Sequence, residues 1–300
     1  MADERAVSCR SPSHVGPCPI RCHSSAVRTM PYLPCLNAST IRPASIPDKI
    51  AAAAAAGFRA IELWNTEVDA FLAEGHTLDD VRALLAQHAL AVPSMIAVMG
   101  FVGNTAPGRA DRVVEARRRM QQARDLGAPF IVASPPMGRA DLAVCGRDYA
   151  ELLALGREIG IRPAMEFLGF VEHVNSIATA REIMENSEDP SATIVVDWFH
   201  MVRGDGRATI LEDLRALRGD QIAIVHLDDV PYRKPFGDMT DGDRVYPGEG
   251  DIPIEELFTV LAETGYDGPV SLELFSEALW AQDPYAVARA GFEKSAGWFA

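Results

Sequence analysis

The sequence predicts a single-domain α/β protein, a (β/α)8 TIM barrel, and three observations support that prediction. From Leu36 onward, short apolar runs alternate with longer segments of helical periodicity, and eight such pairs can be counted. The runs are apolar throughout, as expected of strands in a parallel sheet covered by helices. A barrel of this kind takes about 250 residues, which fits a chain of 300 residues.

Each predicted strand is followed by a predicted helix. The strands are Cys35–Thr40, Phe58–Leu63, Leu90–Ala97, Phe130–Ser134, Arg162–Phe167, Thr193–Asp197, Ile222–Leu227 and Val270–Leu274. The helices are Pro47–Ala56, Leu78–His88, Ala110–Leu126, Gly146–Gly160, Ile177–Asn186, Thr209–Arg218, Ile254–Thr264 and Pro284–Phe299. A doubly wound open sheet is the alternative, but no G-x-G-x-x-G motif follows any predicted strand.

Several helix ends carry local signals. In "GHTLDD", Thr77 is a predicted N-cap, with Asp80 three residues later. The stretches "DLGAPF", "EIGIRP" and "ETGYDGPV" each place a glycine just after a helix and before a strand.

The N-terminal segment differs in composition from the rest of the chain. Residues 1–29 are rich in Ser, Pro, Cys and Arg without periodicity, so we expect a disordered tail, with the barrel occupying residues 30–300. Met30, directly before the first predicted strand, is a candidate for the natural start. Three of the five cysteines lie in this segment. Their spacing fits no standard zinc site, and the cysteines do not form a disulfide framework.

The balance of charge restricts the partners. The chain has 28 basic and 42 acidic residues and a net charge of −14, which disfavours nucleic acid. The longest apolar run, Ile50–Ala56, is far shorter than the roughly 20 residues that a membrane span requires. We therefore expect a cytoplasmic protein. No interface stripe stands out, and a homo-oligomer is compatible with the sequence.

Ionisable residues occupy the ends of four consecutive predicted strands. "AMEFLG" supplies Glu166, "VVDWFH" supplies Asp197, "IVHLDD" supplies His226 and "SLELF" supplies Glu273. The carboxyl ends of barrel strands meet at one face, where the function of these folds is found. We therefore expect these four side chains to form one site.

Three carboxylates buried together need a compensating positive charge. The four strands hold only one basic residue, Arg162, and it lies at the opposite end of its strand. A divalent metal ion is the simplest solution: Mn²⁺ first, with Zn²⁺, Co²⁺ or Mg²⁺ as alternatives for a set of oxygens and one imidazole. His200 follows Asp197 by one helical turn, so we expect it to face the same cavity as a substrate-side polar group.

Further candidates lie near the strand ends. Arg244 in "DRVYPGEG" is predicted to orient substrate hydroxyls or neutralise an oxyanion, or else to pair with neighbouring aspartates of its loop. Trp64 and Trp198 each follow a strand end and would form apolar walls against a sugar ring, or pack at the rim. Asn37 and Glu62 end the first two strands, where structural hydrogen bonding is expected. For both residues, contact with substrate is the alternative.

These residues, together with "CLNAST", "FRAIELW" and "DGDRVYPGEGDI", resemble the xylose-isomerase-like barrels, and within them the inosose (2-keto-myo-inositol) isomerases. The resemblance runs from about Met30 to Ala300. It implies that Glu166, Asp197, His226 and Glu273 are metal ligands. It also implies that Glu166 and Glu273 are the acid/base pair, and that His200 and Arg244 contact substrate oxygens.

The implied reaction is a metal-dependent isomerisation. A carbonyl would move between adjacent carbons of a keto-inositol or keto-sugar through an enediolate. A sugar 3-epimerase, a dehydratase of the inosose or 3-dehydroshikimate type, and a 3-keto-glycoside-processing subunit would use the same metal set. A DNA-repair endonuclease of this fold would need further histidines on the early strands, where none is found. A non-catalytic sugar-binding barrel is the alternative from another class.

Overall fold

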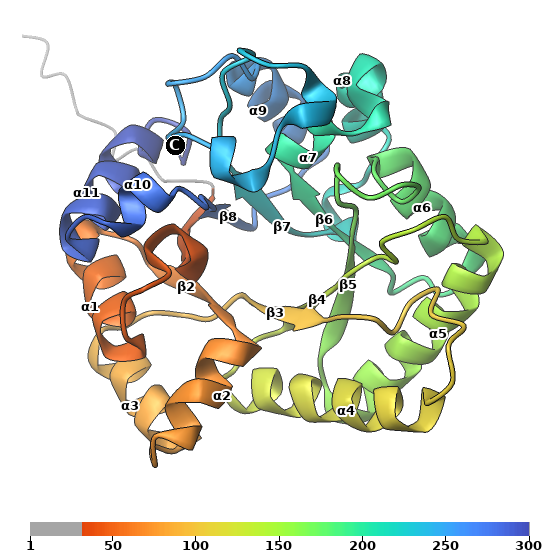
Figure 1. The fold of residues 1–300 in the computed structure, drawn as a ribbon, viewed down its shortest axis with the longest axis horizontal. Coiled ribbons are helices and arrows are strands. Elements are labelled where there is room, and N and C mark those ends of the chain that lie inside the picture. The colour runs from red at the N-terminus through yellow and green to blue at the C-terminus, as the bar shows by residue number, and fades with distance from the viewer. Residues whose placement is uncertain (1–31, 300) are drawn as a thin grey trace, which may run out of the picture.

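Eight parallel strands close into a barrel in which every strand pairs with its neighbours in sequence order (Figure 1). The structure is a computed structural model that describes residues 32–299. The strands are β1 (Leu33–Asn37), β2 (Ala60–Trp64), β3 (Ser94–Val98), β4 (Phe130–Ala133), β5 (Arg162–Glu166), β6 (Thr193–Asp197), β7 (Ile222–Leu227) and β8 (Pro269–Leu272). The predicted (β/α)8 barrel is confirmed.

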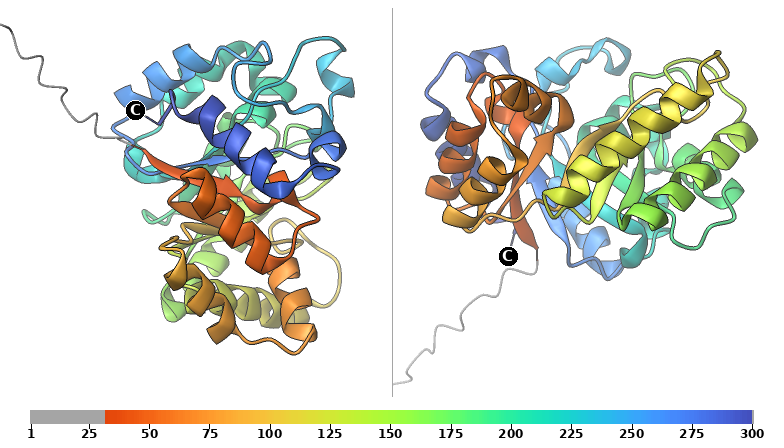
Figure 2. Two further views of the ribbon diagram at one scale, coloured as in Figure 1. Left: turned by 90° about the vertical axis from the view of Figure 1, so that its left-hand side faces the viewer. Right: turned by 90° about the horizontal axis from the view of Figure 1, so that it is seen from below.

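The helices form an outer ring around the strands (Figures 1 and 2). They are α1 (Ile46–Ala56), α2 (Asn65–Ala73), α3 (Leu78–Gln87), α4 (Arg109–Asp125), α5 (Leu142–Ile159), α6 (Ile177–Asn186), α7 (Trp198–Arg203), α8 (Ile210–Arg215), α9 (Ile254–Glu263), α10 (Glu277–Trp280) and α11 (Pro284–Ser295).

The register of the barrel sets the level of the functional side chains. β6 and β7 pair with Asp197 opposite His226, and β7 and β8 pair with His226 opposite Ser271. The barrel closes between β1 and β8, with Leu36 opposite Leu272. The ends of β6, β7 and β8 therefore lie at one level and present their last side chains together.

Some element boundaries differ from the prediction. The first strand stops at Asn37, because this side chain accepts a hydrogen bond from Ser39 N and caps a short 3-10 helix over Ala38–Ile41. The third strand begins only at Ser94. Before it, Ala91 forms an isolated bridge with Ala60.

Among the helices, α2 and the short α7 and α10 were not predicted, because each is short and follows a strand end closely. The last turn of the predicted Thr209–Arg218 helix is not formed, since α8 ends at Arg215. By contrast, α5 begins before its predicted start, with Asp141 accepting hydrogen bonds from Ala143 N and Val144 N.

The predicted helix signals at Thr77 and after α5 are confirmed. Thr77 and Asp80 form a reciprocal capping box at the start of α3. Gly160 ends α5 with φ +87°, a left-handed conformation that costs glycine nothing.

Apolar side chains pack in two layers. The larger cluster fills the space between the barrel and the helices, and the smaller one lies inside the barrel, with Val132, Val195 and Ile224 among its members. The barrel is therefore a filled core rather than a channel, and a site can form only at its ends.

The predicted tail over residues 1–29 lies outside the described residues. Cys35 and Cys145 are free, buried thiols. Among residues 32–299, no helix combines the length and the apolar character needed to pass through a membrane.

Candidate metal centre

Four buried ionisable side chains meet where β5 to β8 end. Glu166 and Asp197 are the last residues of β5 and β6, His226 is the fifth residue of β7, and Glu273 follows β8 directly. The four predicted ligands therefore lie together at the carboxyl end of the barrel.

His226 is at the centre of this group. Its Nδ1 atom is 3.6 Å from Oε1 of Glu166, 3.5 Å from Oδ2 of Asp197 and 3.2 Å from Oε2 of Glu273. Within the described chain, this nitrogen has no hydrogen-bond partner. Ligand atoms of Glu166, Asp197 and His226 also lie within 4.8 Å of one another. This buried nitrogen faces three carboxylate oxygens and has no hydrogen-bond partner among the described residues. Such an arrangement fits a metal ion bound between the nitrogen and the three oxygens.

Arg244 brings a positive charge that the strands lack. Its Nη1 donates to Oδ2 of Asp197 at 2.8 Å, to Oδ2 of Asp228 at 2.7 Å and to Oε2 of Glu273 at 2.9 Å. Its side chain is 1% exposed. The expected counter-charge was sought only within the strands. The loop after β7 supplies one, because Arg244 reaches the buried carboxylates from there. Arg244 also pairs with Asp241, as the alternative prediction for its loop required.

The centre holds more carboxyl groups than cationic side chains. Five carboxyl groups lie within the buried network, namely those of Glu62, Glu166, Asp197, Asp228 and Glu273. Burial raises the pKa of Glu166 and of Asp228 well above the usual value, and it also raises the pKa of Glu273. A divalent cation would allow these groups to ionise, and their hard oxygen donors suit Mn²⁺, Mg²⁺, Co²⁺ or Zn²⁺.

Asp197 behaves differently from its neighbours. Burial acts to raise the pKa of this carboxyl, but the charge of Arg244 outweighs burial and holds the pKa well below its usual range. Asp197 is therefore the carboxylate that is already charged when a cation arrives.

The spacing between Asp197 and His200 is explained by helix capping. Oδ1 of Asp197 accepts a hydrogen bond of 2.7 Å from the backbone N of His200, so Asp197 caps α7 while its other oxygen faces the centre. The imidazole of His200 turns toward Arg244, whose Nη2 lies 3.3 Å from Nε2. Burial lowers the pKa of His200 to about 4. The ring is thus neutral at pH 7, and Arg244 can donate to its Nε2.

The loop that carries Arg244 is built around Asp229. The two oxygens of this carboxylate accept four backbone hydrogen bonds, of 2.8 to 3.0 Å, from Val230, Gly248, Gly250 and Ile252. A side chain at Gly250 would meet Asp229 Oδ1 at 2.3 Å, so only glycine allows this approach. Asp229 thereby fixes the loop from which Arg244 enters the centre.

The side-chain amide of Asn37 makes all of its hydrogen bonds to other groups of the protein. Its Nδ2 donates to Glu62 and to Glu273, both at 2.9 Å, and its Oδ1 accepts from Ser39 N and from Trp64 Nε1. Both amide protons and both acceptor positions are occupied, so no capacity remains for a substrate hydroxyl. The predicted structural hydrogen bonding holds, and the substrate contact does not fit this geometry.

The two tryptophans have different surroundings. Trp64 is half-buried at the mouth of the barrel, edge-on to Phe275 at 6.2 Å, where a ring can contact a ligand. Trp198 is fully buried against Phe258 of α9. The predicted sugar-facing wall is therefore wrong for Trp198, because the first residue of α7 points into the packing between barrel and helices.

Two carboxyl groups of the centre were not among the predicted metal ligands. Asp228 follows "HL" in β7 and ends in contact with Arg244, and Glu62 in "AIELW" contacts His226. An acidic residue inside an apolar strand was the available signal for Glu62. By contrast, β3 and β4 end in Val98 and Ala133, so that side of the barrel end contributes no ionisable group.

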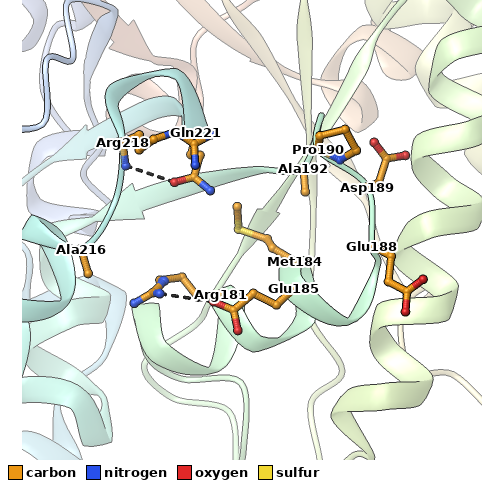
Figure 3. Close-up of a pocket in the computed structure, with 10 residues that line it drawn as sticks. All are labelled: Arg181, Met184, Glu185, Glu188, Asp189, Pro190, Ala192, Ala216, Arg218 and Gln221. Carbon is orange, nitrogen blue, oxygen red and sulfur yellow. Dashed lines mark hydrogen bonds and ion pairs between the residues drawn. The ribbon is translucent and has the colours of Figure 1, made fainter.

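A surface pocket of about 510 Å³ lies away from this centre (Figure 3). Its lining includes Asp189, just before β6, and Gln221, just before β7, so it sits at the opposite end of the strands. Its Arg181 pairs with Glu185. None of the predicted site residues lines it.

The fold agrees with comparisons of sequence. A model of the xylose isomerase-like TIM barrel family matches residues 50–299, which is most of the chain. The protein therefore belongs to the xylose isomerase-like TIM barrel family.

Named relatives come from several enzyme classes. An inosose isomerase of Halalkalibacterium halodurans is 30% identical over 207 residues, which cover 67% of this chain and 72% of that protein. An inosose isomerase of Bacillus velezensis is 26% identical over 80% of this chain and 88% of that protein. A 3-dehydroshikimate dehydratase of Pseudomonas putida is 24% identical over 79% of this chain, but over only 37% of that longer protein.

Solved structures share the fold. The crystal structure of the IOLI protein with a bound zinc atom has a TM-score of 0.81 at 24% identity, covering 89% of this chain and 97% of that one. The structure of an L-ribulose 3-epimerase has a TM-score of 0.70 at 18% identity, covering 88% and 93%.

Proposed function

We propose that this protein is a divalent-metal-dependent isomerase that moves a carbonyl between adjacent carbons of a keto-inositol or keto-sugar. The observation that carries the proposal is the unpartnered Nδ1 of His226 among the carboxylates of Glu166, Asp197 and Glu273. The inosose isomerases among its relatives favour a cyclic keto-polyol as substrate.

His226 and the three carboxylates around its Nδ1 are the proposed ligands. Mn²⁺ is the first choice for three carboxylates and one imidazole, with Zn²⁺, Co²⁺ and Mg²⁺ as alternatives. When bound, such an ion acts as a Lewis acid on a carbonyl and its neighbouring hydroxyl, and lowers the cost of charge developing on them.

Glu166 and Glu273 are the proposed acid/base pair. They come from β5 and from the end of β8, and their oxygens lie 3.6 and 3.2 Å from Nδ1 of His226. One carboxylate removes the proton from the carbinol carbon and gives an enediolate. The other carboxyl group delivers a proton to the former carbonyl carbon, and the hydroxyl proton moves in the same direction, from the carbinol oxygen to the former carbonyl oxygen.

Arg244 and His200 are proposed to hold the substrate oxygens. The guanidinium, already in contact with Asp197 and Glu273, would stabilise negative charge on an oxygen that lies close to them. His200 has no partner for its Nδ1 among residues 32–299, so the proton on that nitrogen of the neutral ring is free to be donated. Trp64 at the mouth would contact the apolar face of a sugar ring.

The test is proton exchange followed by NMR in deuterated water. The protein would be stripped with a chelator, reloaded with one divalent metal at a time, and offered keto-inositols and keto-sugars. We expect metal-dependent deuterium incorporation beside a carbonyl whose position has moved. Stoichiometric metal binding without exchange in any of these compounds would contradict the isomerase and favour a sugar-binding barrel.

A second candidate is a dehydratase or 3-epimerase that uses the same residues. The 3-dehydroshikimate dehydratase relative aligns over 79% of this chain, and an L-ribulose 3-epimerase shares the fold. Loss of water from the substrate would identify the dehydratase. Inverted configuration without a moved carbonyl would identify the epimerase.

A further inference from the structure

The two ring nitrogens of His226 have different surroundings. Nδ1 faces the carboxylates of the candidate metal centre and makes no hydrogen bond within the described chain. Nε2 lies 3.0 Å from Oε2 of Glu62, and both side chains are fully buried. The partner of one nitrogen decides which nitrogen carries the proton.

Glu62 is held so that it can only accept at this oxygen. Besides His226, Oε2 of Glu62 contacts Nδ2 of Asn37 at 2.9 Å and Oγ of Ser271 at 3.1 Å. An amide Nδ2 is always a donor, so Oε2 of Glu62 acts as an acceptor in this network. The arrangement therefore places a proton on Nε2 of His226, so that in the neutral ring the lone pair lies on Nδ1.

The same carboxylate is tied to a second proposed ligand. Nδ2 of Asn37 also donates to Oε1 of Glu273, and Oδ1 of Asn37 is fixed by Ser39 N and Trp64 Nε1. Asn37 thus links Glu62 to Glu273 through one rigid carboxamide. The contacts connect β1 and β2, which supply no proposed ligand, to β7 and the end of β8, which supply two.

We propose that Glu62 is a positioning residue of the metal centre. It sets the orientation of His226, keeps the proton on Nε2 and directs Nδ1 at the position shared by Glu166, Asp197 and Glu273. This inference rests on the proposed function, because it takes His226 to be a ligand. A carboxylate that accepts the second N–H of a metal-ligating histidine typically contributes about 10–100-fold to metal affinity.

The experiment compares Glu62→Leu, Glu62→Gln and the control Ser271→Ala. Leucine removes the acceptor, and glutamine keeps a neutral acceptor of the same shape. Ser271→Ala removes another donor to the same oxygen but keeps the contact between Glu62 and His226. Affinities for Co²⁺ and Zn²⁺ would be measured by competition with a chelator. The Nε2–H resonance of His226 would be followed in the Zn²⁺-loaded protein with ¹⁵N-labelled histidine.

We expect Glu62→Leu to lose about 10–100-fold in affinity, together with the slowly exchanging Nε2–H resonance. Glu62→Gln should lose less affinity, keep the resonance and shift it upfield, and Ser271→Ala should stay close to the wild type. If Glu62→Leu does not fold, the shift and affinity of Glu62→Gln still decide.

Wild-type affinity in Glu62→Leu would overturn the inference, as would an unchanged resonance and affinity in Glu62→Gln. An equal loss of affinity in Ser271→Ala would also overturn it, because the effect would then belong to the network in general. A wild-type protein that binds neither ion would count against the proposed function itself, and so is distinguishable.

Discussion

Nη1 of Arg244 donates a 2.8 Å hydrogen bond to Oδ2 of Asp197, the same oxygen that lies 3.5 Å from Nδ1 of His226. The loop after β7 thus reaches the end of β6 and touches the oxygen that a metal ion would use. The charge of Asp197 and the fold of this loop are coupled, because the buried carboxylate depends on the guanidinium for its ionisation.

The first prediction concerns the support of this loop. Replacing Asp229 by alanine leaves four backbone N–H groups without their acceptor, so we expect a loss of about 2–4 kcal/mol in the free energy of unfolding and a large fall in kcat. Urea unfolding and steady-state kinetics measure both. The control is Asp251→Ala, since that exposed carboxylate accepts a single backbone bond, from Tyr232 N. Equal effects of the two variants would contradict the assignment.

The second prediction concerns acid stability of the metal-free protein. The pKa of His200 is about 4 in the folded chain and roughly 6.5 when unfolded. Below pH 6.5 the unfolded state takes up a proton that the folded state refuses, so stability falls as the pH drops from 6.5 toward 4. The full effect is about 3 kcal/mol. Measuring the free energy of unfolding of the wild type and of His200→Gln across this pH range isolates the contribution of His200. Parallel curves of free energy against pH for the two proteins would refute the prediction.

The third prediction concerns proton release on metal binding. Burial would lower the pKa of His226, but the charges of Glu273 and Glu62 outweigh it and raise the pKa well above its usual value. A proton must therefore leave the ring before Nδ1 can bind an ion. We expect affinity to rise about tenfold per pH unit for each proton released. Calorimetric titrations with Mn²⁺ between pH 6 and 8, in buffers of different ionisation enthalpy, measure the number of protons released. Affinity independent of pH would exclude His226 as a ligand.

The fourth prediction separates the carboxylates that move protons from those that do not. Glu166→Gln and Glu273→Gln should each lower kcat about 10²–10⁴-fold, even when the metal content is restored. Glu277→Gln in α10, an exposed carboxylate just beyond the site, is the control and should keep wild-type kcat. Metal analysis beside the kinetics distinguishes lost chemistry from lost metal. Full activity in either buried variant would remove that residue from the acid/base pair.

The sequence predicted the strand ends well because the argument needed only local patterns. Apolar runs identify strands, and parallel strands bring Glu166, Asp197 and His226 to one end of a barrel whatever the loops do. The side-chain partners were harder to predict. The contacts of Asn37 with Glu273 and of Glu62 with His226 join residues 236 and 164 positions apart.

The sequence also could not predict the direction in which a side chain points after a strand end. Trp64 and Trp198 both follow a strand end, yet one lies at the mouth and the other in the core. The difference depends on how the following helix leaves the strand. Arg244 was predicted as a site residue. Its role as the counter-charge of Asp197 depends on a loop fold that Asp229 fixes through long-range hydrogen bonds.

The ionisable groups crowd one side of the barrel end, since β3 and β4 finish in Val98 and Ala133. None of the hydrogen bonds of these charged groups involves residues 99–108 or 134–141, so we expect substitutions in the loops after these two strands to leave the charged groups in place. When the charged groups and the variable loops come from different strands, the loops can change and alter which substrate is bound while the charged groups stay the same. The loops after β3 and β4 are accordingly the segments in which a library designed for altered substrate preference has most freedom.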